Sequence, residues 1–316
     1  MRRALPLLIA VVALLALPGA ASATLVYGIQ PSRGTASIWV AANAGSGAVK
    51  LASNYGEPTI SPDGTTVAAF RQTRSGGNRL YVLPAAGGPP RSLLSNAGFA
   101  TVAWSPNSST IAAYSGHRLV TANVATGATA TLATGSFPGS APSFSPAGDQ
   151  VVYAKATSSR FNAPSDIYTV PSAGGAPTRL TTDGFSLNPV WGPTQIVYSR
   201  GPRRRQDSPR LNIWLMNPDG SGQHQLTNVR VPSLLSGLAP VQWSAGGLQL
   251  LAEFGGQDTD QAYAVDPTTG TASDLGVRKM DGTSPAAISR DGTTVLAQTG
   301  GQEGPSRGQN VVSIPF

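Results

Sequence analysis

The feature that most constrains the fold is a turn that recurs along the chain. An apolar or aromatic residue is followed by Ser-Pro-Asp-Gly, or by a degenerate form of it, and then by a β-branched strand. Internal repeats with a period of 20–50 residues indicate an array of equal structural units. Six copies begin at Ile60, Trp104, Phe144, Trp191, Trp243 and Ile288, at spacings of 44, 40, 47, 52 and 45 residues.

Each copy continues through the same succession of short strands. A second strand, such as residues 151–153, leads through a loop to a third strand with a central aromatic residue, such as residues 167–170. A glycine turn then precedes a fourth strand that ends in a Leu-Thr pair, as at Leu180 and Thr181. β-Branched and aromatic residues suit pleated, half-buried faces, while Pro and Gly suit tight turns. The repeat therefore predicts an all-β fold, a β-propeller of four-stranded antiparallel blades.

The number of blades follows from the hairpins between second and third strands. Residues 25–40 form one such hairpin and the six repeats supply the others, which predicts seven blades. The first blade would lack its inner strand, and the last, ending at residues 311–316, would lack its outer strand. Six blades with spliced ends are the alternative.

The N-terminus carries the pattern of a secretory signal peptide. Arg2 and Arg3 precede an apolar run over residues 5–17, and Ala21-Ser22-Ala23 offers small residues for cleavage. The run is shorter than the roughly 20 residues that span a bilayer, and no later segment is apolar enough to do so. We expect residues 1–23 to be removed, and residues 24–316 to form a single propeller domain that is secreted or periplasmic, without a membrane span and monomeric.

Composition agrees with a turn-rich exported protein. The chain has 37 Gly, 26 Pro and no Cys, so neither disulfides nor thiolate chemistry contribute. The formal charge is +7, and removal of Arg2 and Arg3 leaves +5, a mild bias spread along the chain. This is not the charge pattern of a nucleic-acid-binding protein.

The repeats resemble the WD-like repeats of the TolB-type propellers. The resemblance rests on the Ser-Pro-Asp-Gly turn, the Ile-Tyr-Val third strand and the Gly-Gly to Arg-Leu-Thr ending, and it covers residues 25–316. TolB itself carries a small α/β domain ahead of its propeller. Because the strand pattern begins at Leu25, we expect no such domain here, and the resemblance implies the repeat architecture without TolB's partner.

One loop between a second and a third strand is rich in arginine. Guanidinium groups form forked hydrogen bonds with carboxylate and phosphate groups, so this loop is the candidate site for a protein or an anionic envelope partner. Long loops that share one face of a rigid scaffold are common binding sites. A solvated insertion is the alternative, and nucleic acid is not expected because interleaved stacking aromatics are missing. The candidate residues are Arg200, Arg203, Arg204, Arg205 and Arg210.

Signals for catalysis are weak. Residues 304–308 match the G-x-S-x-G pattern, but they precede a final strand and no His follows them. His117 and His224 lie in different repeats without spaced carboxylates, which argues against a metal site. We therefore expect no catalytic residue, metal or cofactor, and interpret the chain as a non-catalytic binding module. The alternative is a propeller enzyme, a lyase or a hydrolase, that acts at the mouth of the central channel.

Overall fold

The computed structural model is all-β, as the repeat predicts. Among the described residues the one helical element is the short 3₁₀ helix η1 (Ala245–Gly247). Every strand pairing in this part of the chain is antiparallel, apart from isolated bridges. The structure describes residues 25–29, 35–41, 47–74, 76–98, 102–138, 140–160, 163–202, 210–232, 235–255, 260–279, 286–288, 294–299 and 310–315.

The described strands form six hydrogen-bonded sheets. In five of them the strands follow one another in sequence order. Three have four strands, and the sheets at the two ends of the chain have three. The remaining sheet has eight strands, β4 to β11. Its two halves, β4 to β7 and β8 to β11, are joined by a single residue pair, Ala97 of β7 with Ser115 of β9. The strands from the N-terminal sheet onwards are β1 (Leu25–Ile29), β2 (Ser37–Ala41), β3 (Val49–Ser53), β4 (Gly56–Ile60), β5 (Thr66–Gln72), β6 (Asn78–Pro84), β7 (Arg91–Ala97), β8 (Ala103–Trp104), β9 (Thr110–Ser115), β10 (Arg118–Asn123) and β11 (Thr129–Thr134).

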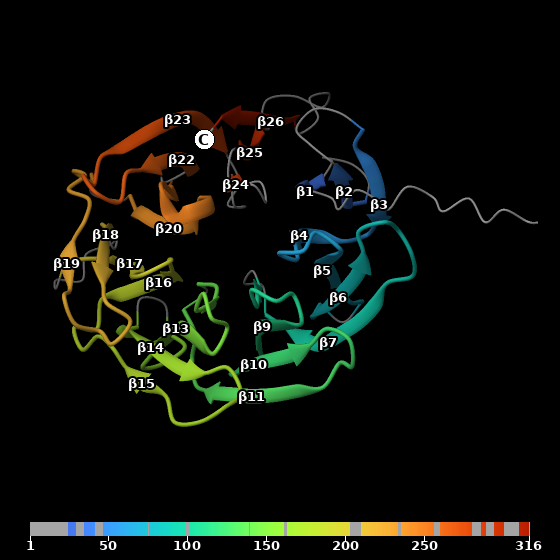
Figure 1. The fold of residues 1–316 in the computed structure, drawn as a ribbon, viewed down its shortest axis with the longest axis horizontal. Helices are drawn as coiled ribbons and strands as arrows, with labels where there is room; N and C mark the ends of the chain where they lie inside the picture. The colour runs from blue at the N-terminus through green and yellow to red at the C-terminus, as the bar shows by residue number, and fades with distance from the viewer. Residues whose placement is uncertain are drawn as a thin grey trace, which may run out of the picture.

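The strands of the second half follow the same pattern. They are β12 (Ser143–Phe144), β13 (Gln150–Ala156), β14 (Ser165–Pro171), β15 (Thr178–Arg179), β16 (Ser186–Trp191), β17 (Ile196–Arg200), β18 (Asn212–Met216), β19 (His224–Gln225), β20 (Gly237–Trp243), β21 (Leu250–Gly255), β22 (Asp260–Val265), β23 (Ala272–Lys279), β24 (Ala286–Ile288), β25 (Thr294–Thr299) and β26 (Asn310–Pro315). The sheets stand in a ring around a common axis, with β4, β16, β20 and β24 towards the centre and β3, β11, β15 and β23 outside (Figure 1).

The repeated turn owes its shape to its first serine. In the first copy Ser61 Oγ donates to Asp63 Oδ1 at 2.5 Å and accepts a hydrogen bond from Thr66 N at 3.0 Å. The turn bends back through Gly64, whose φ of 75° favours glycine. Ser105 repeats both contacts in its own turn. Ser145 accepts from Gln150 N in the same way, and its hydroxyl donates to Asp149, four residues on. The motif therefore closes the hairpin between first and second strands.

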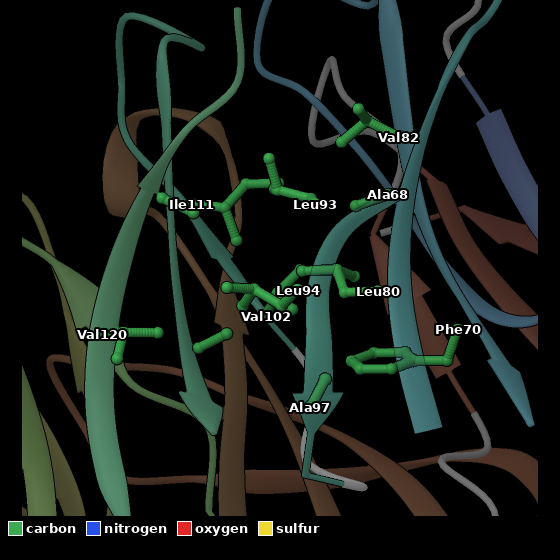
Figure 2. Packing of buried hydrophobic residues seen from close by; sticks show 12 residues of the cluster. Ala68, Phe70, Leu80, Val82, Leu93, Leu94, Ala97, Val102, Ile111 and Val120 are labelled. Carbon is green, nitrogen blue, oxygen red and sulfur yellow. The ribbon is translucent and has the colours of Figure 1, made fainter. Parts of the chain in front are cut away.

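The core lies between consecutive sheets and between the two halves of the eight-stranded sheet. Apolar side chains from β5, β6 and β7 pack on those from β9 and β10, as Figure 2 shows for Leu94, Ile111 and their neighbours. A second cluster joins β9 and β10 to β13, and further clusters join β13 to β17 and β17 to β21. The sheets of β12 to β15 and of β16 to β19 thus bury both of their faces against their neighbours, which explains why their second strands read as nearly continuous apolar runs.

Antiparallel pairing gives each sheet two distinct ends. We call the end where the second strand stops and the third begins the loop end, and the opposite end, which carries the tight turns, the turn end. Turns of successive repeats lie together: Asp63 N donates to Ser108 Oγ at 3.0 Å. Equivalent ends of adjacent sheets therefore share a face of the ring.

Candidate functional site

Charge is separated between the two ends of the sheets. Exposed arginines gather at the loop end, where Glu57 is the exposed acid among the described residues. The turn end has Lys50 and Arg91 but carries exposed aspartates in its tight turns. The positive bias of the sequence is therefore concentrated in space on the loop end, which the even spread along the chain does not reveal. The loop-end arginines are Arg71, Arg74, Arg79, Arg118, Arg160 and Arg230, and the turn-end aspartates are Asp63, Asp149, Asp219 and Asp266.

Two of the turn-end aspartates, Asp219 and Asp266, stay ionised at neutral pH. A hydrogen bond from the Ser221 hydroxyl, with another from its backbone N–H, lowers the pKa of Asp219. Backbone N–H groups of Thr269 and Thr268 lower the pKa of Asp266 in the same way. These carboxylates are held by their own turns, so they maintain negative charge opposite the cationic loop end.

A cavity of about 360 Å³ opens at the loop end of the sheet formed by β16 to β19. This volume is near the lower limit of ligand sites, roughly 300–1,000 Å³. The lining has two arginines and no acidic residue. It consists of Arg200, Gly201, Pro202, Arg210, Asn212, Trp214, Gln225 and Val231.

Arg200 is held in place by its strand, an acid and an aromatic ring. As the last residue of β17, it pairs with Ser186 on one side and Asn212 on the other. Its Nε lies 3.3 Å from Asp183 Oδ2, and its Cζ lies 4.4 Å from the centre of the Trp214 ring. Asp183 is itself fixed by Phe185 N at 2.6 Å and by the Ser186 hydroxyl. Arg200 is thus a preorganised cation with one face on an indole.

Arg210 is anchored through the residue that follows it. Leu211 bridges to Gly237 at the start of β20, through Leu211 N to Ser236 O at 2.8 Å and Leu238 N to Leu211 O at 2.9 Å. Arg210 adopts a φ of 47°, an uncommon conformation for a residue with a side chain. Its buried Nε has no hydrogen-bond partner within the described residues. Arg210 also lines the cavity, so its positive charge lies at the cavity wall.

The tyrosine that precedes this site on β17 remains neutral. Tyr198 is fully buried, and burial raises its pKa to about 12. Its hydroxyl therefore adds no negative charge that would neutralise the nearby guanidinium of Arg200 at physiological pH.

The structure places two of the five predicted arginines at one cavity. Arg200 and Arg210 both line it, whereas Arg203, Arg204 and Arg205 lie outside the described residues. Sequence reasoning missed the partners of Arg200, which are Asp183 and Trp214. Comparison of equivalent repeat positions could have found Trp214, since it stands at the central aromatic position of the third strand.

The other sequence signals do not add to this site. The G-x-S-x-G segment at residues 304–308 lies outside the described residues. His224 Nδ1 lies 2.9 Å from Gly222 O, within its own turn. In the part of the chain that the structure covers, no three His, Asp or Glu side chains gather in a way that could hold a metal ion. Within the same part, no helix has the length and apolar character needed to cross a bilayer.

The ring of antiparallel sheets defines a β-propeller. The family model described as the TolB beta propeller domain matches residues 22–195. The chain therefore belongs to the TolB β-propeller family. No curated protein matches the sequence at a significant level.

Solved propellers of different function share this fold. TolB from Acinetobacter baumannii has 16% sequence identity and a TM-score of 0.58, over 92% of this chain and 79% of that one. An oligogalacturonate lyase in complex with manganese has 12% identity and a TM-score of 0.56, over 92% and 96%. The propeller domain of the Trilobed protease from Pyrococcus furiosus has 13% identity and a TM-score of 0.60, over 92% and 91%. At these identities the likeness concerns the fold alone.

Proposed function

We propose that this protein is an exported, non-catalytic binding module that holds an anionic partner, a protein or an envelope polymer, against its loop end. The observation that carries the proposal is the acid-free cavity between Arg200 and Arg210, set in a surface of exposed arginines. Guanidinium groups recognise carboxylates through paired hydrogen bonds. The surrounding positive field would steer an anion towards them.

We further propose how the protein is processed and how its mature chain is organised. Residues 1–23 are a signal peptide that is removed before Thr24, and residues 24–316 are one monomeric propeller domain. Seven blades are proposed, because a single residue pair joins the two halves of the eight-stranded sheet. Sequencing of exported protein that began at Met1 in place of Thr24 would contradict the cleavage.

The experiment compares two charge-matched double variants on immobilised poly-L-glutamate. R71S/R79S removes two exposed cations from the loop end, and K50S/R91S removes two from the turn end. Surface ion pairs contribute modestly, so we expect roughly 3- to 10-fold weaker binding for the loop-end variant at low salt. Exposed charges are screened over about 8 Å at physiological ionic strength, so wild-type binding should also weaken as salt rises.

The turn-end variant is the control, because both variants change the net charge by the same amount. We expect it to bind poly-L-glutamate as the wild type does. Equal weakening of the two variants would mean that net charge alone drives the attraction, and the proposal of a binding face would be wrong.

A further inference from the structure

Two neighbouring sheets differ in charge at matched positions. In the sheet of β12 to β15, Asp166 pairs with Lys155 and Arg179 pairs with Tyr168 along the strand ladders. In the sheet of β16 to β19, the same ladder positions bring Asn212 to Arg200 and Gln225 to Trp214. The first sheet therefore has an acid and a base where the second has two amides.

The acid of the first sheet, Asp166, is paired with other residues of the same chain. Asp166 has a nearly buried side chain and forms an ion pair with Arg179. Its Oδ1 also accepts hydrogen bonds from Thr181 Oγ1 and Gly184 N, both at 3.0 Å. In this sheet the chain itself supplies the carboxylate that satisfies the outer-strand arginine.

In the second sheet Asn212 accepts hydrogen bonds equivalent to those of Asp166, but it carries no charge. Asn212 Oδ1 accepts from Thr227 Oγ1 at 2.9 Å and Val229 N at 2.8 Å, and its Nδ2 donates to Val229 O at 3.1 Å. Gln225 Nε2 donates to Thr227 O at 2.6 Å. The amides therefore hold the strands together and bring no negative charge to the cavity.

The charges around the cavity leave one positive charge without a counterpart among the described residues. Arg200 and Arg210 supply two positive charges, and Asp183 offsets one through its contact with Arg200. A monoanion balances the remainder, whereas a phosphate group carries about −1.5 to −2 at pH 7. Trp214 and Val231 give the same cavity an aromatic and an aliphatic wall.

We infer that this cavity binds a single carboxylate group carried on a small apolar or planar body. The inference rests on the proposed anionic partner and names the chemical group that the partner would insert. Arg210, which lines the cavity, pairs its guanidinium with the carboxylate, and Arg200 contributes charge from its place over Trp214. The volume of about 360 Å³ admits one such unit.

The test uses benzoate as the probe, with benzamide as its neutral counterpart and phenyl phosphate as the dianionic one. Titration is followed by calorimetry on the mature chain. We expect benzoate to bind saturably and to bind more tightly than both analogues. Benzamide binding as tightly as benzoate, or phenyl phosphate binding more tightly, would overturn the assignment of a carboxylate.

The decisive variant is N212D, which places a carboxylate at the cavity, where the neighbouring sheet has Asp166 at the matched position. The installed carboxylate should neutralise the remaining positive charge of the cavity, and we expect benzoate affinity to fall at least tenfold. R210Q keeps the test valid if N212D does not fold, and the same loss is expected. Unchanged benzoate affinity in a folded variant would overturn the inference.

The two proposals fail in different ways. Binding to poly-L-glutamate depends on the exposed arginines of the loop end, so N212D should retain it. A wild type that binds the polymer through the loop end but does not bind benzoate would refute the carboxylate pocket alone. Polymer binding that is insensitive to R71S/R79S would refute the proposed function.

Discussion

Replacement of Gly237 by Ala should lower the free energy of unfolding by about 3 kcal/mol. Gly237 has a φ of 88°, which costs a residue with a Cβ roughly 1 kcal/mol. The new Cβ would also lie 2.3 Å from Leu211 O and 2.6 Å from Leu211 N, so the backbone must separate. Separation disrupts the two hydrogen bonds of the Leu211 bridge, at about 1 kcal/mol each. Denaturant unfolding measures the loss.

Gly276→Ala is the matched control for this prediction. Gly276 has a φ of 72°, and a Cβ there would meet nothing within 4 Å. It should therefore cost only the conformational term of about 1 kcal/mol. Similar losses of unfolding free energy for the two variants would show that the close contact between Gly237 and Leu211 is not what positions Leu211 beside Arg210.

Replacement of Asp166 by Ala is expected to lower the free energy of unfolding by about 2–3 kcal/mol. The substitution leaves the Gly184 N–H and the Thr181 hydroxyl without their acceptor, and buried unsatisfied groups carry the largest part of such losses. Arg179 adds little to this figure, because its side chain is 47% exposed and water can solvate the freed guanidinium.

Asp166→Asn separates the two contributions. An amide oxygen can still accept from Gly184 N and Thr181 Oγ1, as Asn212 does at the matched position with Val229 N and Thr227 Oγ1. We expect a loss of at most about 1 kcal/mol in thermal or denaturant unfolding, since only the half-exposed ion pair is removed. A loss as large as that of Asp166→Ala would mean that the charge, and not the hydrogen bonding, is essential.

The sequence predicts the architecture because the same local rules act in every repeat. The turn serine closes each first hairpin through its own hydroxyl, as Ser61 and Ser145 do, so the motif marks the same place each time. The Leu-Thr ending also acts within its own repeat. The hydroxyls of Thr181 and Thr227 each accept a hydrogen bond from a backbone N–H of the third strand of the same sheet. Periodic spacing of such contacts predicts strands, their order and the all-β class.

The binding site is less predictable, because its contacts join distant positions. A run of arginines marks the loop, yet Arg200 is oriented by Asp183, which comes from the connection between two sheets. Arg210 depends on Gly237, in the first strand of the next sheet. Asp166 and Asn212 can both be read from the sequence, but only the strand ladders show that they occupy matched positions in two neighbouring sheets.

The central claim is that an anionic partner binds the loop end, and carbodiimide cross-linking to poly-L-glutamate tests it most directly. The reagent joins glutamate carboxylates to nearby lysine amines, and the two ends differ in their lysines. Lys155 lies near the end of β13, at the loop end, whereas Lys50 is exposed at the turn end. Mass spectrometry should find cross-links at Lys155, reduced by high salt, with Lys50 unmodified. Cross-links concentrated at Lys50 would contradict the account.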